Sequence, residues 1–295
     1  MRDIAFRFIA ARFPTHRIAT NAALAAIWRS LYYTLRPAQP FLMRTADYRL
    51  WAHPKRGTLT RAVIRRGHWE PHQTRAFKSF IRPGDFVIDA GANFGHYALT
   101  AATLVGRDGL VIAFEPHPAT FKLLEANAAL LEHRNVVAER AGLGAERGSA
   151  AMTIDLANPG GHSLLEGNVW ERGETIVVPV RTIDDYLESS GLAERRIALI
   201  KIDVQGYEAK VIAGAARAIS RHRPVVFCEI TPEALRQAGD SPRWLLDFFE
   251  ARGYAPRLVV PYGRTGSTVN YQTLAVLLGR GEREYWDVAF VPESR

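Results

Sequence analysis

The feature that most limits how this chain can fold is a series of short apolar runs that begins near residue 84. Segments with apolar residues at helical spacing separate these runs. Strands that are apolar at consecutive positions are buried on both faces, as in a parallel sheet covered by helices. The alternation therefore predicts a doubly wound, mostly parallel α/β fold with right-handed crossovers. The main predicted strands are Phe86–Ile88, Leu110–Phe114, Ile197–Ile202 and Val225–Ile230.

The segments around these strands complete the predicted fold. Helices are predicted at 94–105, 117–131, 206–221 and 242–252. A weaker strand is predicted at 135–140, and hairpin strands at 151–154 and 175–180 within an otherwise irregular segment. Late strands, expected to be antiparallel, are predicted at 258–261, 272–278 and 288–291. Ligands of such sheets bind at the carboxyl ends of the strands, so the residues at those ends are the candidates for function.

Charge divides the chain into two parts. The first 82 residues contain 16 Lys and Arg but only three acidic residues, a net charge of +13 within a total of +8. Such a segment is attracted to anionic partners, which are nucleic acid, lipid head groups or an acidic face of its own fold, and a solvated basic surface is the simplest interpretation. Leu24, Ile27, Leu31 and Leu35 recur at near-helical spacing between arginines, which predicts a partly helical extension. The longest nearly apolar stretch near the start, about 19–28, is interrupted by Asn21 and is shorter than the roughly 20 residues that span a bilayer.

The first candidate site is the turn after the first strand, in the segment VIDAGANFGHYAL. Gly91 and Gly95 let the backbone approach a ligand closely. A dinucleotide fingerprint would have glycine where this chain has Asp89, and an acidic side chain repels a pyrophosphate. The turn therefore favours a cationic or hydroxyl-bearing ligand.

Glu115 follows the second strand and lies 20 residues after Gly95. A carboxylate in this position can accept hydrogen bonds from both hydroxyls of a ribose. Together with the glycine turn, Glu115 indicates a nucleoside site.

A third group of charged residues lies near the ends of two later strands. Lys201 and Asp203 lie on the same side of one strand, and Glu229 lies near the end of the next. Charges inside buried strands are costly unless they are paired. We expect these residues to converge with Asp89 on one edge of the sheet. A structural ion-pair network is the alternative interpretation of Lys201 and Glu229.

These motifs, taken together and in order, resemble the FkbM family of S-adenosylmethionine-dependent methyltransferases. The resemblance covers roughly residues 67–255 and includes GHWEPHQ before the first strand and PVVFCEI in a later one. It implies a class I, Rossmann-like methyltransferase fold with a seven-stranded sheet. The segments that carry it are VIDAGANFGHYAL, AFEPHP, VPVRTIDDYL and IKIDVQGYEAKVIAGA.

The resemblance also implies roles for individual residues. It places Asp89, Gly91 and Asn93 at the methionine end and backbone of S-adenosylmethionine, and Glu115 on the ribose hydroxyls. It places Asp203 between cofactor and acceptor. One position departs from the family, which commonly reads Asp-Val-Glu-Gly where this chain has Gln205 in the third place.

Methylation of an alcohol requires a base for the hydroxyl proton. The candidates are Asp203, Glu229, His96 and His162. The sequence shows no histidine spacing typical of a metal site, and a divalent ion held by Asp203 and a neighbouring carboxylate is compatible with the sequence but not required by it. Cys228 is the only cysteine, and its apolar strand predicts a core position.

The main hypothesis is therefore O-methylation of a hydroxyl on a sugar, glycan or natural product, with S-adenosylmethionine as cofactor. A nicotinamide-dependent oxidoreductase and a non-catalytic membrane- or glycan-binding module are the alternatives. We predict a basic extension at 1–66, with helices and a hairpin, and a methyltransferase domain at 67–295. We expect a cytoplasmic protein that binds no nucleic acid. Peripheral membrane contact and an oligomer are both compatible with the sequence.

Overall fold

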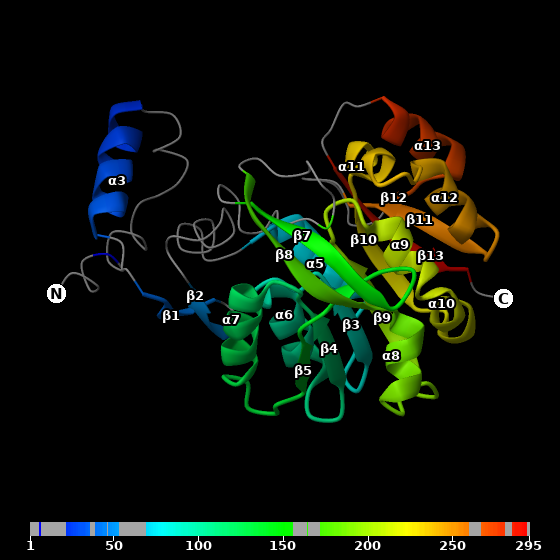
Figure 1. Ribbon diagram of the computed structural model, residues 1–295, viewed down its shortest axis with the longest axis horizontal. Helices are drawn as coiled ribbons and strands as arrows, with labels where there is room; N and C mark the ends of the chain where they lie inside the picture. Colours follow the sequence, from blue (N-terminus) through cyan, green and yellow to red (C-terminus); the bar gives the residue numbers. More distant parts are fainter. Residues whose placement is uncertain are drawn as a thin grey trace.

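A computed structural model of the chain places a central sheet between two layers of helices (Figure 1). The residues that the structure describes are 6, 22–35, 39–45, 47–52, 69–155, 164, 172–259, 267–280 and 285–293. The predicted base His162 lies outside these ranges.

The central sheet confirms the predicted doubly wound, mostly parallel architecture. Seven strands lie in the order β11-β13-β10-β9-β3-β4-β5, and the two-residue β12 extends the β11 edge. The neighbouring pairs from β10 through β5 are parallel, whereas β13 runs antiparallel to both β10 and β11. The strands are β3 (Phe86–Ala90), β4 (Leu110–Phe114), β5 (Val136–Glu139), β9 (Ile197–Ile202), β10 (Val225–Ile230), β11 (Tyr254–Leu258), β12 (Ser267–Thr268) and β13 (Trp286–Pro292).

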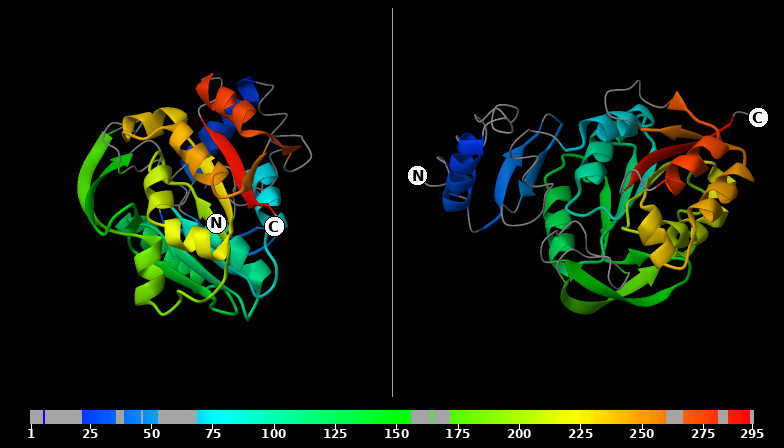
Figure 2. Two further views of the ribbon diagram at one scale, coloured as in Figure 1. Left: turned by 90° about the vertical axis from the view of Figure 1, so that its right-hand side faces the viewer. Right: turned by 90° about the horizontal axis from the view of Figure 1, so that it is seen from above.

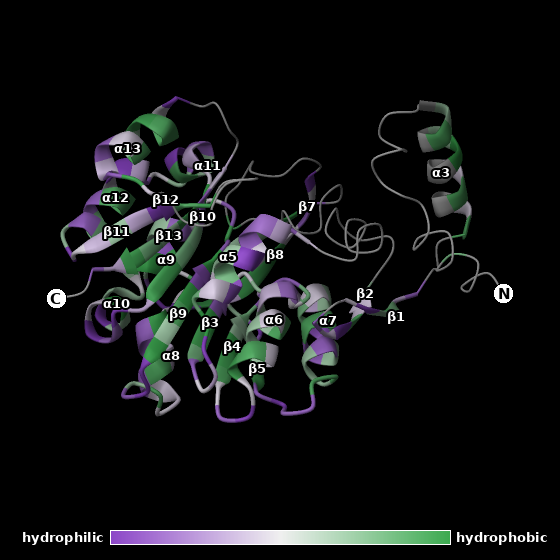
Figure 3. Cartoon of the chain, turned by 180° about the vertical axis from the view of Figure 1, so that it is seen from behind, coloured by the Kyte–Doolittle hydropathy of each residue, from purple (hydrophilic) through white to green (hydrophobic). Residues whose placement is uncertain are grey.

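Helices cover both faces of this sheet because its central strands are apolar at nearly every position (Figure 3). Alternate side chains of a strand point to opposite faces. On one face, Val87, Val111 and Leu199 pack with α5 (Pro71–Ser79), α6 (His96–Val105) and Leu124 of α7 (Pro118–Ala128). The other face packs against α8 (Ile183–Ser189), α9 (Glu208–Ala213), α10 (Ala216–His222), α11 (Pro232–Gln237), α12 (Pro242–Glu250) and α13 (Tyr271–Gly279).

A separate three-stranded sheet occupies the segment predicted to be irregular with hairpin strands. It pairs β7 (Gly148–Asp155) antiparallel with β8 (Arg172–Arg181), and β8 parallel with β6 (Gly142–Leu143). Both long strands exceed the predicted ranges. Their outer parts are exposed, so they lack the apolar residues on which the prediction depended.

The late strand predicted at 272–278 is wrong, because this segment forms helix α13. The side chain of Asn270 accepts a hydrogen bond from the backbone N–H of Thr273 and so caps the helix. Leu274 and Leu278, four residues apart, are buried on one side of it. A short apolar run does not by itself distinguish a buried helix from a strand.

The single helix predicted at 206–221 is divided into α9 and α10 by Gly214. The Gly214 backbone packs so closely on the loop after β6 that an added Cβ would lie 2.0 Å from the carbonyl oxygen of Gly144. The Gly214 carbonyl also accepts a hydrogen bond from the backbone N–H of Asp184, at the start of α8. These tertiary contacts interrupt a segment whose spacing alone is helical.

The N-terminal part contains helix α3 (Ala22–Leu35) and a hairpin formed by β1 (Phe41–Arg44) and β2 (Arg49–Ala52). Figure 2 shows the hairpin between α3 and the rest of the fold. Leu24 and Ile27 on α3 are exposed. Among the described helices, none is long and apolar enough to cross a membrane. The domain division at residue 66, the cytoplasmic location, peripheral membrane contact and oligomerisation stay predictions.

The close approach at Gly214 predicts that Gly214→Ala destabilises the protein. Because the neighbouring atoms are backbone, they cannot move aside cheaply, and we expect the free energy of unfolding to fall by about 1–3 kcal/mol. Denaturant unfolding followed by circular dichroism measures this change. Gly279→Ala in α13 is the control, since a Cβ there would meet no atom within 4 Å. Equal stability of the two variants would contradict the packing argument.

Candidate functional site

The charged residues predicted to converge lie on one face of the sheet. Asp89 of β3 is the register partner of Lys201 on β9. Glu229 of β10 is the register partner of Asp287 on β13. Lys201 is the register partner of Phe227 in β10, two residues before Glu229, so Lys201 and Glu229 share a face. This is the face covered by α5 and α6, and the charges lie at the carboxyl ends of the parallel strands.

The turn after β3 is packed directly against the segment that follows β9. Gly91 has φ +80°, and a Cβ on it would lie 1.9 Å from the carbonyl oxygen of Asp203. The backbone N–H groups of Gly91 and Ala92 both donate to the carbonyl oxygen of Phe114, at 3.1 and 2.9 Å. Only glycine permits this approach, which brings the predicted cofactor turn and Asp203 together.

Glu115 joins this turn to the loop after β4. One of its carboxylate oxygens accepts from the backbone N–H of Asn93 at 3.0 Å, and the other from that of His117 at 2.8 Å. The Asn93 side chain accepts in turn from the backbone N–H of Phe94. Burial raises the pKa of Glu115 to about 7, although the two backbone N–H groups oppose this shift. Each carboxylate oxygen has a second lone pair, so Glu115 retains capacity to accept ligand hydroxyls.

Asp89 is a buried carboxylate without protein partners of ordinary geometry. It is 1% exposed, and among the described residues neither of its oxygens has a hydrogen bond. Burial raises its pKa to about 6, while the Lys201 ammonium lowers it, as does the nearby Ala98 backbone N–H. Unsatisfied buried polar groups in native proteins call for an explanation. A ligand with a cationic group or hydrogen-bond donors fits this one.

Lys201 lies between several carboxylates at the centre of the group. Its ammonium contacts Asp203 Oδ2 at 3.2 Å and lies 4.4 Å from the centre of the Tyr97 ring. Burial alone would lower the pKa of Lys201, but the surrounding carboxylates, Asp203 and Asp89 foremost, raise it above its ordinary value. Lys201 therefore remains charged and offsets part of the repulsion between these carboxylates.

Gln205, the position that departs from the family pattern, connects two carboxylates. Its Nε2 lies 3.1 Å from Asp203 Oδ1 and 3.4 Å from Glu229 Oε1. Asp203 therefore accepts from Lys201 on one oxygen and from Gln205 on the other. A glutamate at 205 would put a third carboxylate beside these two, whereas the amide donates to both.

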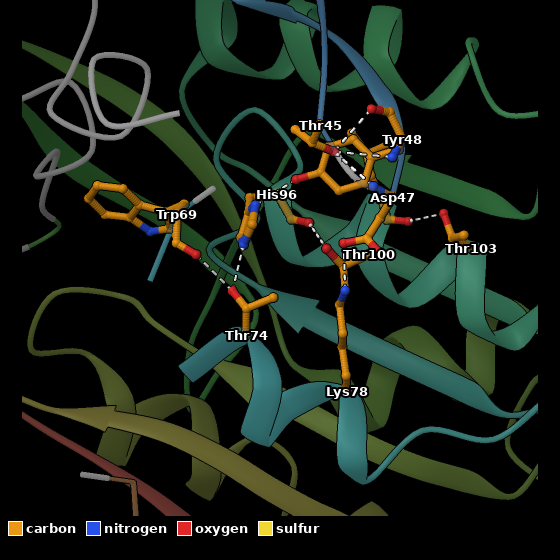
Figure 4. Close-up of polar contacts among 10 residues, drawn as sticks. Thr45, Asp47, Tyr48, Trp69, Thr74, Lys78, His96, Thr100 and Thr103 are labelled. Atoms are coloured by element: carbon orange, nitrogen blue, oxygen red, sulfur yellow. Dashed lines mark hydrogen bonds and ion pairs between the residues drawn. The ribbon is translucent and has the colours of Figure 1, made fainter. Parts of the chain in front are cut away.

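His96 opens helix α6 directly after Gly95, whose φ is +103°. Its Nδ1 lies 2.5 Å from the Tyr48 hydroxyl and its Nε2 lies 3.0 Å from the Thr74 hydroxyl (Figure 4). Burial lowers the pKa of His96 to about 3, with Lys201 adding to the effect. Both ring nitrogens therefore contact protein hydroxyls, an arrangement that disfavours the predicted role of His96 as a base.

Two acidic residues of this site were missed by sequence reasoning. Glu70, just before α5, accepts a hydrogen bond from the Tyr97 hydroxyl at 2.7 Å. Burial, together with Asp203 and Asp287, raises the pKa of Glu70 to about 7. Asp287 lies 9% exposed at the start of β13, and burial raises its pKa to about 7. Two features of the sequence could have indicated them. Glu70 lies in the segment GHWEPHQ, which the family resemblance includes, and Asp287 is an acidic residue within the otherwise apolar β13.

Within the described ranges, no three His, Cys, Asp or Glu side chains form a group that could hold a metal ion. The carboxylates of Asp203, Glu229 and Glu115 instead contact an ammonium, an amide or backbone N–H groups. Cys228 is buried in β10, as predicted.

The Methyltransferase FkbM domain matches residues 89–256, more than half of the 295-residue chain. Methyltransferase 1 of Beauveria bassiana (strain ARSEF 2860) is 28% identical over 188 residues, which cover 58% of this chain and 73% of the relative. The 31-O-demethyl-FK506 methyltransferase FkbM of Streptomyces tacrolimicus is 31% identical over 165 residues, covering 45% of this chain and 60% of the relative.

Among solved structures, the methyltransferase FkbM of Methylobacillus flagellatus KT superimposes with a TM-score of 0.41 at 16% identity. The match covers 78% of this chain and 53% of that one. The chain thus spans only part of the length of these relatives.

The burial of Asp287 predicts an unusual dependence of stability on pH. Because the folded state raises its pKa from 3.8 to about 7, the folded state binds the proton more tightly than the unfolded state does. The contribution of Asp287 to stability is therefore lost as pH rises from about 4 to about 7. Asp287→Asn cannot ionise, so its free energy of unfolding should exceed that of the wild type by roughly 1–3 kcal/mol at pH 8 and match it more closely at pH 5.

Denaturant titrations at the two pH values measure this difference. Glu132→Gln, which removes the charge of an exposed glutamate, is the control. If Asp287→Asn is less stable than the wild type by the same amount at pH 8 and at pH 5, the ionised Asp287 carboxylate does not destabilise the folded state.

Proposed function

Because this chain belongs to the FkbM methyltransferase family, we propose that it transfers a methyl group from S-adenosylmethionine to a hydroxyl oxygen of a sugar, glycan or natural-product acceptor. The observation that carries the proposal is the group of carboxylates beside the Gly91 turn, which includes Asp89, whose buried oxygens form no hydrogen bond of ordinary geometry with the residues that the structure describes. The relative from Streptomyces tacrolimicus is named for 31-O-demethyl-FK506, a name that specifies an oxygen acceptor.

The cofactor side of the site is formed by residues 89–95 and Glu115. When bound, S-adenosylmethionine supplies a methyl group activated by a sulfonium cation. Asp89 and Asp203 supply negative charge for such a cation, and the remaining lone pairs of Glu115 can accept two hydroxyls. Gly91, Asn93 and Gly95 form the backbone turn between these carboxylates. The fit is one of charge and hydrogen-bonding capacity.

The acceptor side is formed by residues at the ends of β9, β10 and β13. An acceptor oxygen that takes up a methyl group must release its proton, and a carboxylate oxygen of this chain receives it. Burial and the nearby Asp203 and Asp287 raise the pKa of Glu229, which makes it a stronger base than an ordinary carboxylate. We assign the base role to Glu229. Asp203 then has a positioning role, because its two oxygens accept hydrogen bonds from Lys201 and Gln205 and so fix these two side chains.

The alternative of a nicotinamide-dependent oxidoreductase is set aside by membership of a methyltransferase family. The buried Asp89 carboxylate also disfavours a pyrophosphate at the turn. A phosphate group on the reacting part of the acceptor is disfavoured for the same reason, because Glu70, Asp203, Glu229 and Asp287 surround one ammonium.

The proposal predicts that the wild type binds S-adenosylhomocysteine and that Glu115→Gln binds it more weakly. The carboxylate has lone pairs left on both oxygens for ligand hydroxyls, whereas the new amide turns one of those two positions into a donor. One hydroxyl of the bound ligand then loses its acceptor and is left unpaired, which costs about 1–3 kcal/mol, so we expect the affinity to fall about five- to 150-fold. Titration calorimetry measures the change.

Glu125→Gln on the exposed side of α7 is the matched control and should bind as the wild type does. A folded wild-type protein that binds neither S-adenosylmethionine nor S-adenosylhomocysteine would refute the proposed function. Equal affinities for Glu115→Gln and wild type would remove Glu115 from the cofactor site.

The base assignment predicts a loss of turnover in Glu229→Gln. Transfer of labelled methyl groups to a panel of sugars, glycans and polyketide alcohols identifies an acceptor. With that acceptor, Glu229→Gln should lower kcat by about 10²–10⁴, because the amide cannot take up a proton. The affinity for S-adenosylhomocysteine should change little. A variant with wild-type kcat would show that another group accepts the proton.

A further inference from the structure

We propose that the hairpin β1–β2, which lies within the predicted N-terminal extension, positions the cofactor site without contacting the ligand. Through Asn127 and His96 the hairpin keeps the turn at residues 91–95 in the conformation that binds the cofactor. The inference depends on the proposed function, since it concerns affinity for the same cofactor.

Asn127 of α7 is the first connection between hairpin and turn. Its side chain is fully buried, and its Oδ1 accepts from the backbone N–H of Trp51 at 2.5 Å. Its Nδ2 donates to the carbonyl oxygen of Trp51 at 3.2 Å and to that of Phe94 at 2.8 Å. The amide thus pairs with both backbone groups of one β2 residue, as a neighbouring strand would, and with the turn. One side chain fixes both segments.

The second connection runs from Tyr48, in the turn of the hairpin, to His96 (Figure 4). The Thr74 hydroxyl donates its hydrogen to the carbonyl oxygen of Trp69 at 2.9 Å, so toward His96 it can only accept. His96 Nε2 therefore carries the proton, and Nδ1 accepts from the Tyr48 hydroxyl. This assignment requires a neutral imidazole, which the burial of His96 also favours. The hairpin, α5 and α6 meet at this ring.

Apolar packing and an ion pair fix the hairpin in place. Tyr48 and Leu50 pack with Phe94 and Leu99 in a small buried cluster between the hairpin and α6. At the hairpin turn, Lys78 of α5 contacts Asp47 at 2.5 Å (Figure 4). The hairpin is therefore connected to α5 and to α6, the helix that follows the cofactor turn.

The turn gains from such support because it contains left-handed backbone. Asn93 has φ +53°, a conformation that asparagine tolerates better than most residues with a Cβ but that still costs free energy, which the surrounding contacts offset. The Asn93 N–H donates to Glu115. The next residue, Phe94, accepts a hydrogen bond from Asn127 and packs in the apolar cluster with Tyr48 and Leu50. A turn that is already ordered loses less conformational entropy when a ligand binds. Loosening the hairpin should therefore weaken cofactor binding at a distance.

The first test is Tyr48→Phe in the full-length chain, with S-adenosylhomocysteine as the probe. Removing one hydroxyl should weaken binding by about three- to tenfold in calorimetry, the effect of one hydrogen bond. Hydrogen–deuterium exchange of residues 91–98 should become faster in the free protein and return to wild-type rates when the probe is saturating.

The matched control is Tyr186→Phe, which removes a buried tyrosine hydroxyl bonded to Glu139 on the opposite face of the sheet. It should lower the melting temperature as Tyr48→Phe does, yet leave both the affinity and the exchange of residues 91–98 unchanged. A purely structural role for Tyr48 predicts no such difference between the two variants.

Asn127→Asp is the second variant, since it keeps the acceptor for Trp51 but removes both amide donors. It should accelerate exchange at residues 91–98 more than Tyr48→Phe does. Wild-type exchange and affinity in both folded variants would overturn the proposal. Failure of the wild type to bind the probe would instead refute the proposed function, and the exchange rates of the free variants would still decide whether the hairpin holds the turn.

Discussion

A buried ammonium is what allows so many acidic side chains to gather at one edge of this sheet. Lys201 lies on β9 between the strands that carry Asp89 and Glu229, and it contacts Asp203 directly. Without a cation, desolvation and mutual repulsion would make several buried carboxylates prohibitively unstable as a charged group. With one cation the group remains rich in carboxylates that have raised pKa values, Asp89 at about 6 and Glu70 and Asp287 at about 7.

This incomplete neutralisation connects the fold to its chemistry. A site that holds more carboxylates than cations favours a cationic ligand and retains groups that can take up a proton near neutral pH. Gln205 contributes by donating to two of the carboxylates without adding charge. The same residues therefore serve stability poorly, and under the proposed function they serve methyl transfer, as is common where function and folding make opposite demands.

Sequence reasoning succeeded where one local pattern decides the outcome. The bounds of β4, β9 and β10 were predicted correctly because those strands are apolar throughout and are buried on both faces. It failed at 272–278, where a short apolar run is equally compatible with a helix, and at Gly214, where the Gly144 backbone interrupts a helical pattern. In the site, Asp89, Lys201, Asp203 and Glu229 were predicted to converge because the ends of neighbouring strands meet at one edge.

The sequence by itself therefore determined the sheet, the glycine turn and the carboxylates that follow the parallel strands, since each depends on residues close together along the chain. Only the tertiary structure decided which distant residues complete the site. Glu70 joins through the entry to α5, and Asp287 through its pairing with Glu229 across antiparallel strands. Asn127 contacts Trp51, 76 residues away, and Tyr48 contacts His96, 48 residues away. Contacts of this kind arise from packing between elements, and no spacing along the chain records them.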